Sequence, residues 1–132
     1  MIVADTDVLI DALNGREPAR GRIWTELGSG HLATTSISAF ELRSGVKSAE
    51  AAEKVEGLLA GVSILPFDEL AASRGADVRL KLEASGSRIG MADYLIAGIC
   101  LAHSAALLTR NARHFERVPG LTLVRWESPS PD

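Results

Sequence analysis

Five acidic residues are the first candidates for chemistry in this chain. Asp5, Asp7 and Asp11 crowd the apolar start MIVADTDVLIDAL, Glu41 lies in SAFEL, and Asp93 lies in GMADY. Crowded carboxylates repel one another and resist desolvation, so they need compensation. A hard divalent cation, Mg²⁺ or Mn²⁺, supplies it, because such ions prefer oxygen ligands.

Carboxylates that hold such a cation are a known arrangement for phosphodiester hydrolysis. The ion orients an attacking water, lowers its pKa and neutralises the phosphate, so no protein nucleophile is needed. None stands out here, since the chain has no G-x-S-x-G motif and no convincing Cys–His pair. We expect Cys100, in the apolar run LIAGICLAH, to be a buried and unreactive thiol. The three histidines are scattered along the chain, which disfavours zinc.

Length and composition indicate one globular domain. The chain has 132 residues, 46% apolar and 23% charged, so we expect a single domain at 1–126 and a flexible Ser- and Pro-rich tail at 127–132. The net charge of −3 argues against broad phosphate-driven binding to nucleic acid. We expect a cytoplasmic protein without signal peptide or membrane span, because acids interrupt its apolar runs and its single cysteine suits a reducing compartment.

Short apolar strands alternate with helical patterns along the chain. Strands are expected at 2–4, 31–35, 63–67, 105–109 and 121–126. Helices are expected at 6–14, 18–30, 36–47, 48–61, 68–86 and 91–104, with Thr6 capping the first of them. This alternation predicts an α/β fold in which helices cover both faces of a parallel sheet. No Gly-rich loop follows the first strand, which disfavours a dinucleotide or P-loop site.

In an open parallel sheet, ligands bind at the carboxyl ends of the strands. Asp5 follows the first strand, and Thr109, Arg110 and Asn111 follow the fourth. Glu41 and Asp93 fall in the first turns of helices that begin near that edge. The topology therefore predicts that Asp5, Glu41 and Asp93 gather there, although they are distant in sequence.

Each acid also has a structural alternative. Ser38 and Glu41 have the S-x-x-E spacing of a capping box, and Asp93 gains from the dipole of its helix. Asp7 and Asp11 lie one turn apart on the first helix. We expect Asp11 to be a solvated charge, and Asp7 is open between that role and the site.

Four segments together carry a family resemblance: ADTDVLID, SISAFELRSGV, RIGMADYLIAG and LLTRNARHFERVPGL. In this order and spacing, the chain resembles the PIN-domain ribonucleases over almost its whole length, and in particular the small VapC-type toxins of toxin–antitoxin pairs. The resemblance implies a three-layer α/β/α sandwich with a parallel sheet of about five short strands. It also implies an endoribonuclease that depends on Mg²⁺ or Mn²⁺.

The resemblance carries catalytic and metal-binding roles onto Asp5, Glu41 and Asp93. A fourth acidic position of the family falls on Asn111, where many relatives have aspartate. An amide still offers an oxygen ligand, but it removes one negative charge and weakens the case for a second metal ion.

Three further residues match supporting positions. Thr6 and Thr109 correspond to small hydroxyl residues that help order the site in the family, and the alternative for both is local capping. Asp7 stands where relatives often have an uncharged polar residue, and it is an additional candidate ligand that offsets the charge missing at Asn111.

The resemblance also implies partners. These toxins form homodimers, cleave RNA, and are covered by a cognate antitoxin that inserts a segment into the acidic groove. The antitoxin binds operator DNA, so we expect no sequence-specific DNA binding by this chain. Candidate phosphate contacts at the groove rim, each otherwise a solvated charge, are Arg43, Lys47, Arg88, Arg110 and Arg113.

Three other interpretations remain open at this point. A haloacid-dehalogenase-like phosphotransferase would use Asp5 as nucleophile and Asp7 as acid/base. A receiver-like domain would use Asp68 as phosphoacceptor. Such a domain also requires a lysine after the fifth strand, and this chain has none there. A PIN-like domain that only binds RNA or protein, with catalysis lost through Asn111, is the strongest of the three.

Overall fold

The computed structural model describes residues 1–126, so the expected flexible tail at 127–132 lies outside the described residues. Its centre is a parallel sheet in the order β3-β2-β1-β4. The strands are β1 (Ile2–Ala4), β2 (Leu32–Thr35), β3 (Ser63–Leu65) and β4 (Ala106–Leu108). The first four predicted strands are confirmed, with shorter bounds for the second, third and fourth.

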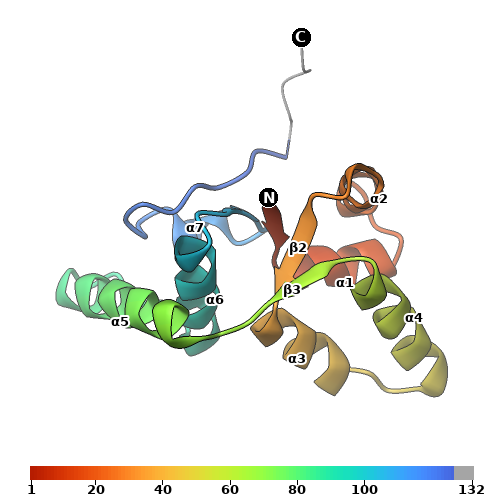
Figure 1. The fold of residues 1–132 in the computed structure, drawn as a ribbon, viewed down its shortest axis with the longest axis horizontal. Coiled ribbons are helices and arrows are strands. Elements are labelled where there is room, and N and C mark those ends of the chain that lie inside the picture. The colour runs from red at the N-terminus through yellow and green to blue at the C-terminus, as the bar shows by residue number, and fades with distance from the viewer. Residues whose placement is uncertain (127–132) are drawn as a thin grey trace, which may run out of the picture.

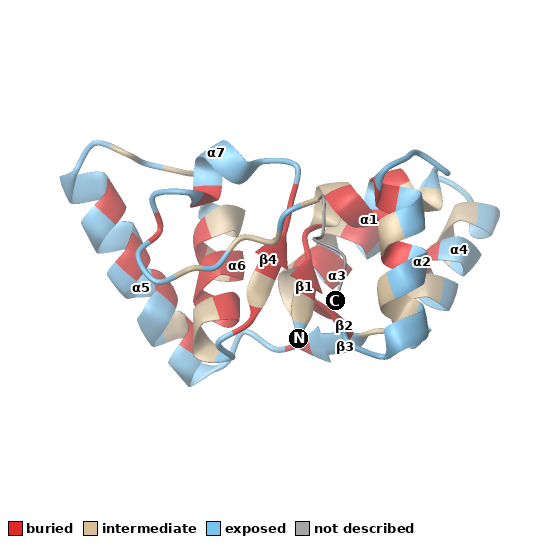
Figure 2. Ribbon diagram, turned by 90° about the horizontal axis from the view of Figure 1, so that it is seen from above, coloured by how far each residue is buried: buried red, intermediate tan, exposed pale blue. Residues whose placement is uncertain are grey.

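Helices cover both faces of the sheet, as Figures 1 and 2 show. The helices are α1 (Thr6–Leu13), α2 (Ala19–Ser29), α3 (Ser36–Ser44), α4 (Ala49–Ala60), α5 (Glu69–Ala84), α6 (Met91–Ala102) and α7 (Ala112–Phe115). Helices α1, α2 and α4 lie on one side, and α5, α6 and α7 lie on the other (Figure 2). The three-layer sandwich is confirmed, whereas the short helix α7 was not expected.

Two hydrophobic cores sit on opposite faces of the sheet. Val3 and Leu107 belong to the core under α5 and α6, and their chain neighbours Ala4 and Leu108 belong to the core under α1, α2, α3 and α4. This alternation follows the two-residue period of a strand. It explains why β1 and β4 are apolar throughout, since both of their faces are buried. None of the described helices is long and apolar enough to cross a membrane.

The expected fifth strand at 121–126 is wrong. Only Leu123 pairs with the sheet, in an isolated parallel bridge to Leu107. Beyond this bridge, the guanidinium of Arg22 donates to the carbonyl oxygens of Arg125 and Trp126 at 3.0 and 3.1 Å, and the indole N–H of Trp126 donates to the carbonyl oxygen of Thr109 at 3.2 Å. These two carbonyl oxygens accept from a side chain of α2 instead of from β4. The pairing with β4 is therefore limited to the bridge at Leu123, and the described sheet has four strands.

Close packing of α5 against α6 fixes the helix that carries Asp93. A Cβ added to Gly98 would lie 2.9 Å from the Cα of Gly75 and would clash with the backbone of Ala71. Only glycine permits this approach between the two helices. Helix α6 is thereby held with its N-terminal turn at the carboxyl edge of the sheet.

Candidate active site

Asp5 is the carboxylate at the end of β1 and the N-cap of α1. Its Oδ1 accepts from the backbone N–H of Thr6 at 2.8 Å, and its Oδ2 accepts from the hydroxyl of Thr109 at 2.7 Å. Thr6 was expected to be the cap, but it is the first residue of the helix. The residue is only 5% exposed, so Asp5 is a buried carboxylate held between two neighbouring strands.

Burial raises the pKa of Asp5 to about 6, from an ordinary value of 3.8. The hydrogen bonds from Thr109 and Thr6 lower this pKa, and the negative charges of Asp7 and Asp93 raise it further. The charge on Asp5 is therefore stabilised only by the neutral donors Thr6 and Thr109, which do not offset the effect of burial on its pKa.

Thr6 joins Asp5 to Glu41 on the neighbouring helix α3. Its hydroxyl donates to Glu41 Oε1 at 2.6 Å and lies 2.8 Å from Ser38 Oγ. The capping box expected for Ser38 and Glu41 is wrong, because Thr35 caps α3 by accepting from the N–H of Ser38 at 3.0 Å. The carboxylate of Glu41 is thus free of any capping role and turns toward the start of α1.

Asp93 lies in the first turn of α6, and its partner is a residue that the sequence did not single out. Oδ2 of Asp93 is 2.9 Å from Nδ1 of His114, which is half-exposed on α7. In the sequence, His114 lies three residues after Asn111 in TRNARHF. This spacing would have indicated a residue near the site only if the short helix α7 had been predicted. When the imidazole of His114 carries its proton on Nδ1, it donates to Asp93 and orients that carboxylate.

The three carboxylates surround the same edge without forming a closed cage. Within residues 1–126, no group of three or more Asp, Glu, His or Cys side chains is arranged to hold a metal ion. Asp5, Glu41 and Asp93 are each held by a different donor, which keeps like charges apart.

The donor set nevertheless fits a hard divalent cation. All its atoms are oxygens, and no ion pair in the described part of the chain joins Asp5 or Glu41 to a basic residue. The buried Asp5 accepts hydrogen bonds only from the backbone N–H of Thr6 and the hydroxyl of Thr109, which are neutral donors. An ion of the Mg²⁺ class is suited to such a set.

The turn after β4 brings Thr109 and Asn111 to this edge. The hydroxyl of Thr109 donates to Asp5 and accepts from the backbone N–H of Asn111 at 3.0 Å. Asn111 is exposed and lies at the start of α7. Its backbone is therefore part of the site, and a ligand role for its amide side chain stays a prediction.

Asp7 and Asp11 form an acidic pair on α1, in addition to the three carboxylates Asp5, Glu41 and Asp93. Asp11 was expected to be solvated, but it is only 6% exposed, and its Oδ2 lies 3.2 Å from Nε of Arg110. Asp7 Oδ2 accepts from the backbone N–H of Arg110 at 3.2 Å. Burial raises the pKa of Asp7, while Val8 and Arg110 lower it. Asp11 is buried rather than solvated because the face of α1 that carries it packs against the turn after β4.

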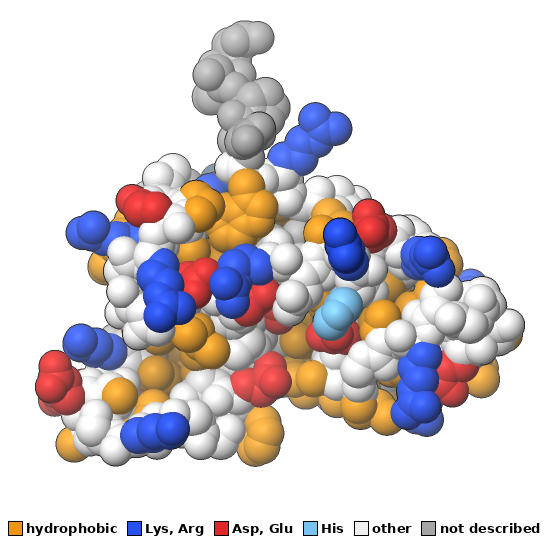
Figure 3. Space-filling model, turned by 180° about the vertical axis from the view of Figure 1, so that it is seen from behind, with side chains coloured by type: hydrophobic (Ala, Val, Ile, Leu, Met, Phe, Trp, Pro, Cys, Tyr) orange, Lys and Arg blue, Asp and Glu red, His pale blue; other side chains and the backbone are white. Residues whose placement is uncertain are grey.

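Basic side chains flank the acidic edge (Figure 3). Two of the five predicted phosphate contacts are engaged elsewhere: Arg43 makes a bidentate pair with Glu56 at 3.0 and 2.9 Å, and Arg110 pairs with Asp11. The other three are exposed, namely Lys47, Arg88 and Arg113.

The receiver-like alternative loses support from the structure, and the prediction for Cys100 is confirmed. Asp68 caps α5 by accepting from the N–H of Ala71 at 3.0 Å, which is a structural role rather than that of a phosphoacceptor. Cys100 is buried as predicted, and burial raises the pKa of its thiol to about 12.

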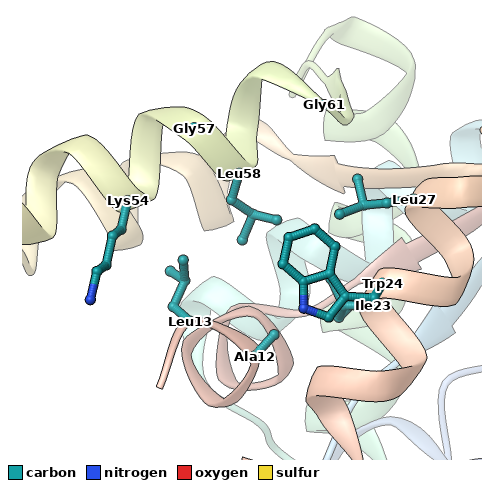
Figure 4. A pocket seen from close by; sticks show the side chains of 9 residues that line it. All are labelled: Ala12, Leu13, Ile23, Trp24, Leu27, Lys54, Gly57, Leu58 and Gly61. Carbon is teal, nitrogen blue, oxygen red and sulfur yellow. The ribbon is translucent and has the colours of Figure 1, made fainter. Parts of the chain in front are cut away.

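An apolar groove lies away from the acidic edge, between α1, α2 and α4. It has a volume of about 490 Å³ and is lined mainly by Leu13, Ile23, Trp24, Leu27 and Leu58. The indole of Trp24 points toward Leu58 across the groove (Figure 4), yet the residue is 64% exposed. A large exposed aromatic in an apolar groove is typical of a protein-binding surface.

A model of the PIN domain matches residues 2–121. The chain belongs to the PIN domain family. A PIN domain combines the parallel sheet with the acidic edge described above, so the family resemblance drawn from the sequence is confirmed.

Curated relatives of this PIN domain include nucleases. Ribonuclease VapC10 of Mycobacterium tuberculosis is 38% identical over 115 residues, which cover 87% of this chain and 86% of that protein. The tRNA(fMet)-specific endonuclease VapC of Shigella flexneri is 29% identical over 126 residues, covering 92% and 95% of the two chains.

A solved structure shares the fold. In the crystal structure of VapBC2 from Rickettsia felis bound to a DNA fragment from their promoter, one chain superposes with a TM-score of 0.85 and 28% identity. The match covers 96% of this PIN domain and 100% of that chain. The whole architecture is therefore shared.

Proposed function

We propose that this PIN domain is the toxin of a type II toxin–antitoxin pair and cleaves RNA phosphodiester bonds with Mg²⁺ or Mn²⁺. The observation that carries the proposal is the buried Asp5, whose ionised form has only neutral donors. Relatives named as VapC ribonucleases support the activity. The oxygen-only donor set supports the metal class.

In this proposal Asp5, Glu41 and Asp93 hold the ion, with Asp7 and Asn111 as additional candidates. When bound, the ion lowers the pKa of the attacking water and neutralises charge on the scissile phosphate. The protein's part is to orient the carboxylates. Thr109 does so for Asp5 and Thr6 does so for Glu41, each through one hydroxyl hydrogen bond.

Two further groups complete the site. His114 holds Asp93 from α7, so that Oδ1 of this carboxylate is left for the ion. The exposed cations Lys47, Arg88 and Arg113 contact RNA phosphates on either side of the acidic edge, where they offset its repulsion of the backbone.

The test is cleavage of a structured RNA by the purified protein with Mn²⁺, with Mg²⁺ and with EDTA. We expect cleavage only with metal, and we expect Asp93→Asn to lower kcat/KM about 100-fold. Asp77→Asn, an exposed acid on α5, is the matched control and should leave the rate unchanged. Cleavage in EDTA, or an active Asp93→Asn variant, would contradict the proposal.

A PIN domain that binds RNA without cleaving it is the second candidate, because Asn111 is neutral and exposed. It predicts metal-independent RNA binding by a protein that shows no cleavage in any metal. Restored cleavage in Asn111→Asp would then identify the missing charge as the cause.

The second part of the proposal is a cognate antitoxin, supported by the VapBC2 complex among the structural neighbours. We assign the groove of α1, α2 and α4 to an apolar antitoxin segment that carries an acidic residue for Lys54, which lines the same groove. Such a segment buries Trp24 as an aromatic anchor. We also propose a homodimer, to be checked by light scattering, and leave DNA binding to the antitoxin.

The groove is tested by co-purification with the small protein encoded beside this chain. We expect Trp24→Ala to weaken the complex about 100-fold, in line with the loss of an aromatic anchor. Leu80→Ala is the control, because Leu80 is equally exposed but lies on α5. Equal affinity for the two variants would exclude this groove as the docking surface.

A further inference from the structure

The turn after β4 is fastened to the first helix at three points. The hydroxyl of Thr109 donates to Asp5, and the N–H of Arg110 donates to Asp7. The third point is Nε of Arg110, which lies 3.2 Å from Oδ2 of Asp11 and 3.9 Å from Oδ2 of Asp7. Of the residues in these contacts, only Asp11 was expected to lie outside the acidic edge.

Asp11 gives this attachment its strength. Asp11 lies on the buried face of α1, and its Oδ1 has no hydrogen-bond partner in the described structure. Arg16 approaches that oxygen only to 3.7 Å, from an exposed position. Arg110 is therefore the principal compensation for a buried charge, and its removal leaves that charge nearly unpaired.

We propose that Arg110 and Asp11 form a positioning pair for the active site. The pair fixes the turn that presents Thr109 to Asp5 and Asn111 to the same edge. Arg110 contacts neither RNA nor the ion in this role. The inference rests on the proposed ribonuclease function and adds two residues to it, one of which the sequence suggested as a phosphate contact and the other as a solvated charge.

Burial and charge distinguish this role from phosphate binding. The Arg110 side chain is 54% exposed, but its Nε and its backbone N–H both point at α1. A phosphate contact by Arg110 would have to draw the guanidinium away from Asp11. That exchange would expose the uncompensated carboxylate of Asp11 to the phosphate, which is unfavourable.

The experiment is a double-mutant cycle on the full chain, with Arg110→Gln, Asp11→Asn and the double variant. RNA cleavage with Mn²⁺ gives kcat and KM, and calorimetry gives the affinity for Mn²⁺ alone. Arg79→Gln and Glu83→Gln are the controls, because this pair has the same Nε–carboxylate geometry, at 2.9 Å, on α5. Arg110→Lys keeps the charge and should recover part of the loss.

We expect each single variant to lower kcat about tenfold, with KM nearly unchanged, because the reacting groups are misplaced. The double variant should be no worse than either single one. Affinity for Mn²⁺ should fall in all three, while the controls match the wild type. A rise in KM in Arg110→Gln alone would instead show a phosphate contact, and additive losses or wild-type behaviour would also overturn the pair.

Amide hydrogen exchange separates failure of the pair from failure of the proposed function. We expect the amides of Arg110 and Asn111 to exchange faster in both single variants than in the wild type and the controls. If the wild type cleaves no RNA, the ribonuclease proposal fails, and this measurement still decides the pair. Unchanged exchange in both variants would overturn the pair even in an active enzyme.

Discussion

Two sets of carboxylates meet at the start of α1, and they are compensated in different ways. Asp5 and Glu41 receive hydrogen bonds from the hydroxyls of Thr109 and Thr6, whereas Asp11 faces the guanidinium of Arg110. Asp5 and Asp11 are almost equally buried. The difference shows that the set with its own cation holds the fold together, and that the set without one is suited to bind a cation.

The largest effect should separate Asp5 from Asp11 by activity. We expect Asp5→Asn to lower kcat/KM for RNA cleavage with Mn²⁺ by about 1000-fold, because it removes the charge that binds the ion. Asp11→Asn should cost only about tenfold, since it acts through the turn. Equal losses in the two variants would remove the distinction between the sets.

The next effect concerns stability without metal, and it has opposite signs for the two residues. The pKa of Asp5 is raised to about 6 in the fold, so its ionised form is disfavoured there. The resulting penalty is absent below about pH 4, grows as the pH rises, and is complete above about pH 6. It amounts to at most about 3 kcal/mol.

Thermal unfolding in EDTA at pH 4 and pH 7.5 measures this penalty. At pH 7.5 we expect Asp5→Asn to be more stable than the wild type, and at pH 4 the two should be alike. Asp11→Asn should be less stable than the wild type at pH 7.5, because Arg110 loses its partner. A destabilised Asp5→Asn at pH 7.5 would show that Asp5 has a structural role like that of Asp11.

A smaller effect tests the hydroxyl that holds Asp5. Thr109→Val removes a hydrogen bond that lowers the pKa of Asp5, so this pKa should rise further, by about one unit. The acidic limb of the pH–rate profile should move to higher pH by the same amount. Thr109→Ser keeps the hydroxyl and should leave the acidic limb of the profile in place. If Thr109→Val also leaves the acidic limb in place, the titration of Asp5 does not determine it.

The smallest effect adds a charge to the acidic edge. Asn111→Asp should tighten Mn²⁺ binding about fivefold, the Coulomb gain of one further carboxylate in a solvated position. Isothermal calorimetry of the variant and the wild type measures it. Asp77→Asn again serves as the reference, and an unchanged affinity in Asn111→Asp would remove Asn111 from the set of ligands.

Most of the fold could be predicted from local patterns. Apolar runs such as Ile2–Ala4 read as buried strands, and Gly30 and Ser48 mark the ends of helices that the structure contains. The run at 121–126 was also predicted to be a strand, but it forms one bridge, and Arg22 binds the carbonyl oxygens of its last two residues. Nothing local in the sequence reveals that competition from a residue about one hundred positions away.

The prediction of the acidic edge was uneven for a related reason. Asp5 and Glu41 were singled out together because strand ends and helix starts share one edge of a parallel sheet. Their partners were assigned less well, since local spacing suggested a cap for Thr6 and a capping box for Ser38. The structure gives both hydroxyls to the contact between α1 and α3 instead.

The sequence by itself determined the order of the elements, the family and the identity of the acids, because alternation, apolar content and carboxylate chemistry are properties of the residues. Only the tertiary structure decided which acids have a counter-charge. Asp5 and Asp11 are the same residue type in the same short segment, but α1 turns one toward hydroxyls and the other toward Arg110. That choice depends on how the turn after β4 packs on α1, and no pattern within the segment encodes it.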